Sequence, residues 1–263
     1  MVLVQDVLDF LNTIAPPYMK MDWDNVGLLF GGKDRQVTRI LVALDPFEDV
    51  VREAAEQGAE LLVTHHPLIF TPLRQITETT ALGRTVLLLA RHNISAINAH
   101  TNLDCAPGGV NDCLARQLDL LGTEVLNPSG TDEQGRSWGL LRAGFTEPQP
   151  LSRFLELVKC RLGCPGLRYV SGGREVRHVA VGGGACAGEM DRALAAGCDT
   201  FVTADVKYNQ FWDARDRGLN LIDAGHFYTE NPVCRVLAEQ LAAHFPALTV
   251  LCSEKHRDCM EFC

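Results

Sequence analysis

The stretch Leu61-Leu62-Val63-Thr64-His65-His66-Pro67-Leu68 decides how the rest of the chain is interpreted. Its apolar residues predict a short buried strand, and two histidines and a proline stand where that strand ends. Open α/β sheets bind ligands beyond the carboxyl ends of their strands, so the imidazoles lie where a ligand site is expected. Successive side chains of an extended backbone point to opposite faces, which favours separate metal ions for His65 and His66.

The composition is that of a globular protein. Hydrophobic residues make up 46% of the 263 residues, enough for one large core or two smaller ones. The formal charge is −9 and no Lys/Arg cluster occurs, which argues against a nucleic-acid partner, because binding to phosphate backbones needs dense positive charge. No apolar run approaches the roughly 20 residues of a membrane span, and the start lacks a basic leader. We therefore expect no membrane partner, a cytoplasmic location and ten reduced cysteines.

Segments typical of strands and helices alternate along most of the chain. Before residue 127 we expect strands at 40–44, 61–64 and 95–100, and helices at 4–14, 46–57 and 82–92, with another helix from Gly109. Residues 127–138 interrupt this pattern with turn formers. After them we expect strands at 139–145, 179–181 and 199–203 and helices at 151–162 and 188–196. Such alternation is typical of largely parallel sheets.

The second half of the chain repeats the first. Residues 40–43 match 179–182, residues 58–64 match 197–203, and His66 then falls opposite Asp205. We therefore expect an α/β fold with two similar halves that arose by internal duplication. The predicted halves are 1–126 and 127–263, with mainly parallel sheets whose strand ends face a shared metal cleft.

The side chains at these strand ends are of metal-ligand types. The candidate ligands are His65, His66, Asp104, His226 and Glu230, with His100 and Asp205 close behind. Imidazole and carboxylate groups together suit Zn, Fe, Mn, Ni or Co, whereas Ca or Mg alone would need an all-oxygen shell. Five such ligands are too many for one open tetrahedral centre and fit two divalent ions that share a carboxylate. A single histidine near a strand end is more often a surface or capping residue, which is the alternative for His100.

Two loops allow two interpretations each. Residues 21–32 mix turn formers with large apolar residues, so they form a packed turn or place Asp24 and Asn25 at the rim of a site. The glycine-rich residues 182–188 lie between a strand and a helix, so they form a tight turn or contact a phosphate. The first interpretation is favoured in both cases.

A series of motifs also resembles a known family. The motifs are Asp24-Asn25-Val26-Gly27-Leu28, Thr64-His65-His66-Pro67-Leu68, His100-Thr101-Asn102-Leu103-Asp104, Gly109-Val110-Asn111 and Gly225-His226-Phe227-Tyr228-Thr229-Glu230. In this order they resemble the NIF-three-like family, whose members are called GTP cyclohydrolase 1 type 2 homologues. The resemblance runs from the N-terminal helix nearly to the end of the chain.

This resemblance implies a dinuclear metal site between two α/β halves and a ring-shaped homohexamer. It assigns His65 and Asp104 to one ion, His66 and His226 to the other, and a bridging position to Glu230. It also implies that a C-terminal strand at 248–252 crosses into the first half. The chain departs from many relatives at Thr203-Ala204-Asp205, where they have Thr-Gly-Glu or Thr-Gly-Asp, and at Tyr208-Asn209 in place of a later histidine. The short connection at 127–138 leaves no room for the extra domain of long members.

The leading functional hypothesis is a metal-dependent hydrolase. Two ions would polarise a small-molecule substrate and lower the pKa of bound water, and His100 or Asp205 would move protons. The family's name implies opening of the imidazole ring of GTP with release of formate, although no guanine pocket is recognisable in the sequence. The alternative is a non-enzymatic, hexameric metal-binding protein that acts as a metal chaperone or an interaction scaffold.

Overall fold

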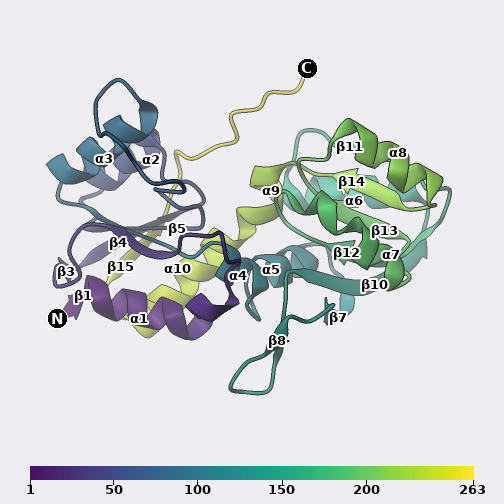
Figure 1. Cartoon of the computed structure of the whole chain (residues 1–263), viewed down its shortest axis with the longest axis horizontal. Helices are drawn as coiled ribbons and strands as arrows, with labels where there is room; N and C mark the ends of the chain where they lie inside the picture. Colours follow the sequence, from purple (N-terminus) through teal and green to yellow (C-terminus); the bar gives the residue numbers. More distant parts are fainter. The chain divides into compact units, whose positions relative to one another are not determined.

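The computed structural model describes residues 1–263 as two compact units, which we describe separately (Figure 1). Unit 1 comprises Met1–Leu103 and Cys234–Arg257, and unit 2 comprises Asp104–Val233 and Asp258–Cys263. The expected boundary after residue 126 therefore has to be corrected. Strand β7 (Leu121–Leu126) pairs with β10 (Leu141–Gln149), so the chain before residue 127 already contributes to the second sheet.

Unit 1 is built on a five-stranded sheet in the order β15-β4-β5-β6-β2. The strands are β15 (Thr249–Cys252), β4 (Arg39–Ala43), β5 (Leu61–Thr64), β6 (Ser95–Asn98) and β2 (Gly27–Phe30). The first four are parallel, and β2 pairs antiparallel with β6. The strand that precedes the two histidines is therefore central, and the C-terminal strand β15 completes the sheet beside β4. Residues 21–32, expected as a packed turn, also supply the edge strand β2. Strands β1 (Val2–Leu3) and β3 (Gln36–Val37) form a separate short pair.

Helices cover both faces of this sheet. Helices α2 (Glu48–Glu56) and α3 (Ala81–Arg91) lie on one face, and α1 (Val4–Ile14) and α10 (Pro232–His244) lie on the other (Figure 1). All four residues of β5 are buried, because a parallel strand between two helical layers has no solvent-facing side. This explains why residues 61–63 form a continuous apolar run rather than an alternating one.

Unit 2 has a six-stranded sheet in the order β11-β14-β13-β12-β10-β7. Its central strands β12 (Val176–Val181), β13 (Thr200–Thr203) and β14 (Asn220–Asp223) are parallel, whereas β11 (Arg168–Val170), β10 and β7 are antiparallel to their neighbours. The hairpin of β8 (Gly130–Thr131) and β9 (Ser137–Trp138) lies in the predicted interruption. The predicted α/β class with mainly parallel sheets is confirmed, and in unit 2 the parallel strands are confined to the centre of the sheet.

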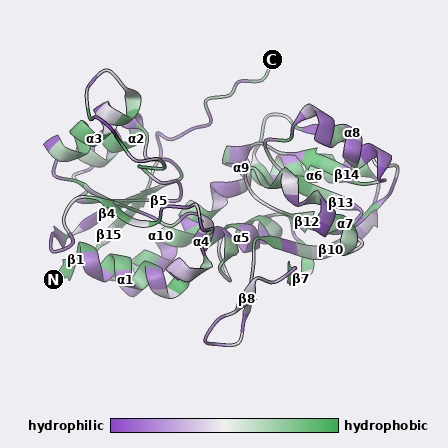
Figure 2. Cartoon of the chain, viewed as in Figure 1, coloured by the Kyte–Doolittle hydropathy of each residue, from purple (hydrophilic) through white to green (hydrophobic).

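Side chains of β12 alternate between two separate cores in unit 2. Val179 and Val181 pack in a cluster with Leu114 of α5 (Val110–Gln117) and Phe154 of α6 (Leu151–Leu162). Ala180 packs in another cluster, which includes residues of α7 (Met190–Ala195) and α8 (Tyr208–Asp216). The sheet is thus hydrophobic on both faces, and Figure 2 shows green strands around β14 next to a largely purple α8. No helix combines the length and hydrophobicity that crossing a bilayer requires.

The residues matched in the sequence repeat make the same contact in both units. The carboxylate of Glu60 accepts hydrogen bonds from the backbone N–H of Thr38 at 3.0 Å and of Arg39 at 2.8 Å. The carboxylate of Asp199 accepts hydrogen bonds from the backbone N–H of Arg177 at 3.1 Å and of His178 at 2.8 Å. Each carboxylate thereby joins the starts of two neighbouring parallel strands. The internal duplication remains a prediction, and this shared contact is consistent with it.

Candidate metal-binding site

Three histidines of unit 1 gather at the carboxyl ends of β5 and β6. The ring centroids of His65 and His66 are 4.9 Å apart, and those of His65 and His100 are 5.2 Å apart. One ring nitrogen of each of the three lies within 4.8 Å of the others. The expectation that His65 and His66 point to opposite faces fails, because β5 ends at Thr64 and both histidines lie in a bend where strand alternation no longer applies. From the sequence, His100 was a weaker candidate than His65 and His66, whereas in the structure it lies in one cluster with them.

An oxygen atom orients each of these three rings. His65 Nδ1 donates to the carbonyl oxygen of Ala99 at 2.9 Å. His66 Nδ1 lies 2.7 Å from Asp45 Oδ1, and His100 Nδ1 lies 2.8 Å from Asp24 Oδ1. A proton held on Nδ1 places the lone pair of a neutral imidazole on Nε2, which is the usual arrangement of histidines that bind metals.

Asp24 lies in the loop for which a site-rim position was the second interpretation. Besides His100, its carboxylate accepts hydrogen bonds from the backbone N–H and the hydroxyl of Thr101. Burial raises the pKa of Asp24, but the hydrogen bonds from His100 and Thr101 outweigh burial and hold that pKa well below its usual range. Asp24 is therefore a carboxylate at the rim of the histidine cluster, as that interpretation expected.

Asp45 and His256 are two residues that sequence reasoning missed. Asp45 follows the end of β4, as His66 follows the end of the neighbouring parallel strand β5. The sequence could therefore have placed both residues at the same edge of the sheet. His256 Nε2 lies 2.9 Å from Asp45 Oδ2, and nothing in the C-terminal sequence indicates this contact. Burial raises the pKa of Asp45, but hydrogen bonds from His256 and His66 lower it by more than burial raises it. The pKa of Asp45 is therefore held well below its usual range.

Unit 2 contributes a second cluster, made of His226, Glu230 and Asp104. The short helix α9 (His226–Glu230) places His226 and Glu230 one turn apart, with 3.0 Å between Nε2 and Oε2. The carboxylates of Asp104 and Glu230 lie within 4.8 Å of each other, and both residues are buried. Asp104 belongs to α4 (Thr101–Cys105), the helix in which the chain passes from unit 1 to unit 2. Asp205 lies 2.8 Å from His226 Nδ1, so it orients this ring as Asp45 orients His66.

The glycine-rich loop at 182–188 packs against this second cluster. Gly183 N donates to Asn111 Oδ1 at 2.7 Å, and Gly184 N donates to Thr229 Oγ1 at 3.0 Å. Because protein side chains accept hydrogen bonds from these two amides, a phosphate would lose two of its donors, and this favours the tight turn. A Cβ atom on Gly184 would come within 2.0 Å of Glu230 Oε1 and 3.0 Å of His226 Nε2. The missing side chain thus makes room for two candidate ligands.

The two clusters fit divalent transition metals in their chemistry. Unit 1 offers three imidazoles, and unit 2 offers one imidazole and two carboxylates. This mixture of nitrogen and oxygen donors suits Zn, Fe, Mn, Ni or Co. Each imidazole has an oxygen partner at Nδ1, and metal-binding histidines typically have such a partner, which fixes the orientation of the ring.

Comparisons with known proteins extend over nearly the whole chain. The model of the Duf34/NIF3 (NGG1p interacting factor 3) family matches residues 2–258. A Clostridium perfringens protein named GTP cyclohydrolase 1 type 2 homolog is 33% identical over 261 residues, covering 98% of this chain and 99% of the relative. A Streptomyces coelicolor protein of the same name is 39% identical over 244 residues, covering 90% of this chain and 85% of the relative. The crystal structure of a Bacillus cereus protein related to NIF3 matches with a TM-score of 0.94 at 27% identity, covering 100% of this chain and 99% of that one.

Proposed function

The chain belongs to the Duf34/NIF3 family, and from that premise we propose that it is a metal-dependent hydrolase with a dinuclear centre. The observation that carries the proposal is the cluster of His65, His66 and His100, in which an oxygen atom orients each imidazole through Nδ1. Buried and half-buried imidazoles with this arrangement are typical of metal ligands rather than of surface histidines. The acidic cluster of unit 2 supplies the carboxylates that such a centre needs.

We assign two divalent ions to five residues. As the family resemblance implies, His65 and Asp104 would hold one ion, His66 and His226 would hold the other, and Glu230 would serve both. The family resemblance and the donor types of these residues support this assignment. When bound, such ions supply Lewis acidity, which polarises a substrate and makes water more acidic.

The two residues that were candidates for proton transfer receive different roles. Asp205 contacts His226 Nδ1, and this contact supports a role in orienting the ring rather than in proton transfer. His100 is the better proton carrier, because its ring lies next to His65 and His66 while Asp24 holds its Nδ1. A histidine is suited to proton transfer near neutral pH.

The proposed substrate is a small molecule with a hydrolysable bond. Relatives carry the name GTP cyclohydrolase 1 type 2 homolog, which supports testing GTP ring opening with release of formate. The second candidate function is a non-enzymatic metal chaperone or scaffold, which the same ligand clusters would also serve. For either function we propose a cytoplasmic, ring-shaped homohexamer, as the family resemblance implies. Light scattering should then give six times the chain mass of 28.9 kDa.

The deciding experiment measures metal content per chain in protein purified without chelator, together with formate release from GTP before and after metal stripping. Two ions per chain and metal-dependent formate release would establish the cyclohydrolase. Two ions without turnover would favour another substrate or the chaperone. The double variant His65→Ala/His66→Ala should lose both ions and stay folded, whereas His92→Ala, an exposed histidine at the end of α3, should keep them. Metal retained in the double variant would disprove the assignment.

A further inference from the structure

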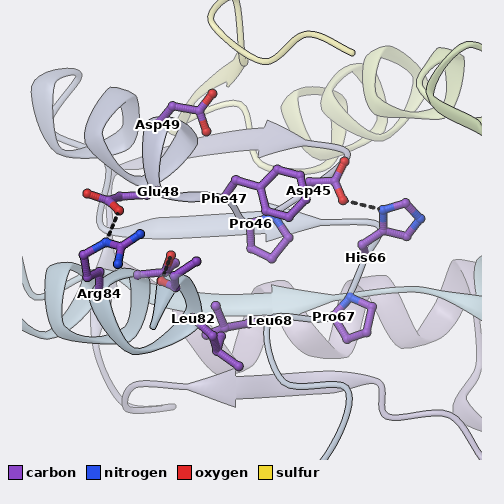
Figure 3. A pocket seen from close by; sticks show the side chains of 12 residues that line it. Asp45, Pro46, Phe47, Glu48, Asp49, His66, Pro67, Leu68, Leu82 and Arg84 are labelled. Carbon is purple, nitrogen blue, oxygen red and sulfur yellow. Dashed lines mark hydrogen bonds and ion pairs between the residues drawn. The ribbon is translucent and has the colours of Figure 1, made fainter. Parts of the chain in front are cut away.

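A pocket of about 600 Å³ opens beside His66 within unit 1 (Figure 3). It lies between the start of α2 and the start of α3, and His66 and Asp45 form one of its ends. Small-molecule sites in proteins typically measure about 300–1,000 Å³, so the volume suits one organic ligand. All of its lining residues belong to unit 1.

The walls of this pocket are mainly apolar. Phe47 and Pro46 line it on one side, and Pro67, Leu68 and Leu82 line it on the other (Figure 3). Phe47 is 57% exposed although it is a large aromatic residue, so its ring has surface available for a ligand. A flat aromatic ring buries the most apolar surface in such a pocket, because both of its faces can contact apolar side chains.

The far end of the pocket is closed by an ion pair. Arg84 Nε donates to Glu48 Oε2 at 2.9 Å, and another nitrogen of Arg84 donates to the carbonyl oxygen of Glu78 at 3.2 Å. Glu48 also accepts a hydrogen bond from Arg52 at 2.6 Å. Hydrogen bonds from Arg84 and Arg52 lower the pKa of Glu48, which keeps this carboxylate ionised at neutral pH.

The charges that line the pocket disfavour an anionic ligand. Arg84 is the single cation among the lining residues, whereas Asp45, Glu48 and Asp49 supply three carboxylates. Because Arg84 is already engaged, a phosphate or carboxylate group in the pocket would find no cation without breaking the existing pair. An uncharged ligand pays no such desolvation cost.

We infer that this pocket binds an uncharged, flat aromatic part of the substrate, of one or two fused rings, with the bond to be cleaved directed toward His66. The direction of the cleaved bond toward His66 rests on the proposed hydrolase function, whereas binding of the aromatic ring in the pocket does not. Any phosphate groups that a substrate carries lie outside this pocket. The walls thus select the ring, and the His66 end faces the bond to be hydrolysed, whether that bond lies in the ring or beside it.

The test uses two probes of the same shape, neutral 2-naphthamide and anionic 2-naphthoate, titrated by fluorescence into the full-length protein in the presence of chelator. Naphthamide should bind at least about tenfold more tightly than naphthoate, because the pocket offers the carboxylate no available cation. Leu82→Trp should fill the pocket and weaken naphthamide binding by about tenfold or more. Leu87→Trp, on the same helix but outside the lining of this pocket, should leave binding unchanged.

Two results would overturn the inference: naphthoate binding as tightly as naphthamide, or Leu82→Trp binding naphthamide like the unmodified protein. If Leu82→Trp fails to fold, Phe47→Ala provides the second variant, since truncation of an exposed side chain should leave the fold intact and still weaken naphthamide binding. Chelator removes the metal from the assay. Failure of the proposed hydrolase therefore leaves this result standing, and failure here leaves the metal assignment untouched.

Discussion

Asp45 accepts a hydrogen bond from His66, with 2.7 Å between Oδ1 and Nδ1. The other oxygen of Asp45 contacts His256, so one carboxylate connects a candidate metal ligand to the C-terminal segment. That segment is itself fixed, because Glu53 accepts hydrogen bonds from the Ser253 hydroxyl and from the backbone N–H of Glu254. The orientation of the His66 ring thus depends on residues about two hundred positions away in the sequence.

Asp45→Asn should weaken metal binding at His66. An amide keeps the shape of the carboxylate but lacks the charge that holds the Nδ1 proton, and loss of such orienting groups typically lowers metal affinity by about 10–100-fold. The measurement is Zn²⁺ or Mn²⁺ affinity by chelator competition. Asp34→Asn, at an exposed position, is the matched control and should bind metal normally. Equal affinity in both variants would remove Asp45 from the proposed site.

The candidate ligands could be predicted from the sequence because each stands next to a strand or helix end with a clear hydrophobic pattern. Helices at 4–14 and 151–162 have the predicted bounds for the same reason. The first strand of unit 2, β7, could not be predicted, since most of Leu121–Leu126 is exposed and its apolar and polar residues do not alternate. The contact between Asp45 and His256 could not be predicted either, because it depends on how β15 brings the C-terminal segment back to β4.

His100→Gln and Asp205→Asn should affect different quantities. Gln cannot carry a proton as imidazole does, so His100→Gln should lower kcat of any metal-dependent hydrolysis while metal content stays near that of the unmodified protein. Asp205→Asn should instead lower metal content, because the orienting partner of His226 is weakened. Metal analysis and turnover on the same samples separate the two effects. If His100→Gln lost metal and Asp205→Asn lost only turnover, His100 would be the residue needed for metal binding and Asp205 the proton carrier.

Glu230→Ala should remove both ions if Glu230 bridges them. Its carboxylate lies 3.0 Å from His226 Nε2 and within 4.8 Å of the carboxylate of Asp104, so it is close to both other candidate ligands of unit 2. Metal content per chain measured by mass spectrometry gives the answer. Glu239→Ala, at an exposed position of α10, serves as the control and should retain both ions. Loss of one ion alone would refute the bridging position.

The reactivity of the cysteines should follow their burial. All ten are free thiols, and burial raises the pKa of Cys105 and of Cys198 to about 12. A protonated, buried thiol reacts poorly with iodoacetamide, whereas exposed Cys160 and Cys259 should be alkylated in the folded protein. Peptide mass mapping before and after denaturation checks this. Rapid labelling of Cys105 or Cys198 in the folded state would contradict the structure.

The Glu60 carboxylate should make the free energy of unfolding of unit 1 fall as the pH is lowered into the acidic range. Burial raises its pKa, but hydrogen bonds from Thr38 and Arg39 outweigh burial, so the net pKa is lowered in the folded state. A lowered folded-state pKa gives stability that is fully present above the unfolded pKa and lost as the pH falls through the folded value. Glu60→Gln should therefore destabilise the protein at neutral pH and reduce the loss of stability on acidification. Urea unfolding at several pH values tests this against Glu175→Gln, an exposed control. Identical pH profiles for both variants would contradict the prediction.

Gly184→Ala should lose metal as well as stability. Gly184 has φ +62°, so any side chain there is strained, and the added Cβ would also displace Glu230 Oε1. Gly163 is the matched control, because it has φ +67° with nothing within 4 Å of an added Cβ. Backbone strain alone should cost about 1–2 kcal/mol in either variant. Only Gly184→Ala should also lower metal content, because its Cβ takes the space of a ligand. Denaturant unfolding and metal analysis of the two variants separate strain from displacement, and full metal content in Gly184→Ala would show that the Glu230 carboxylate can move without losing the ions.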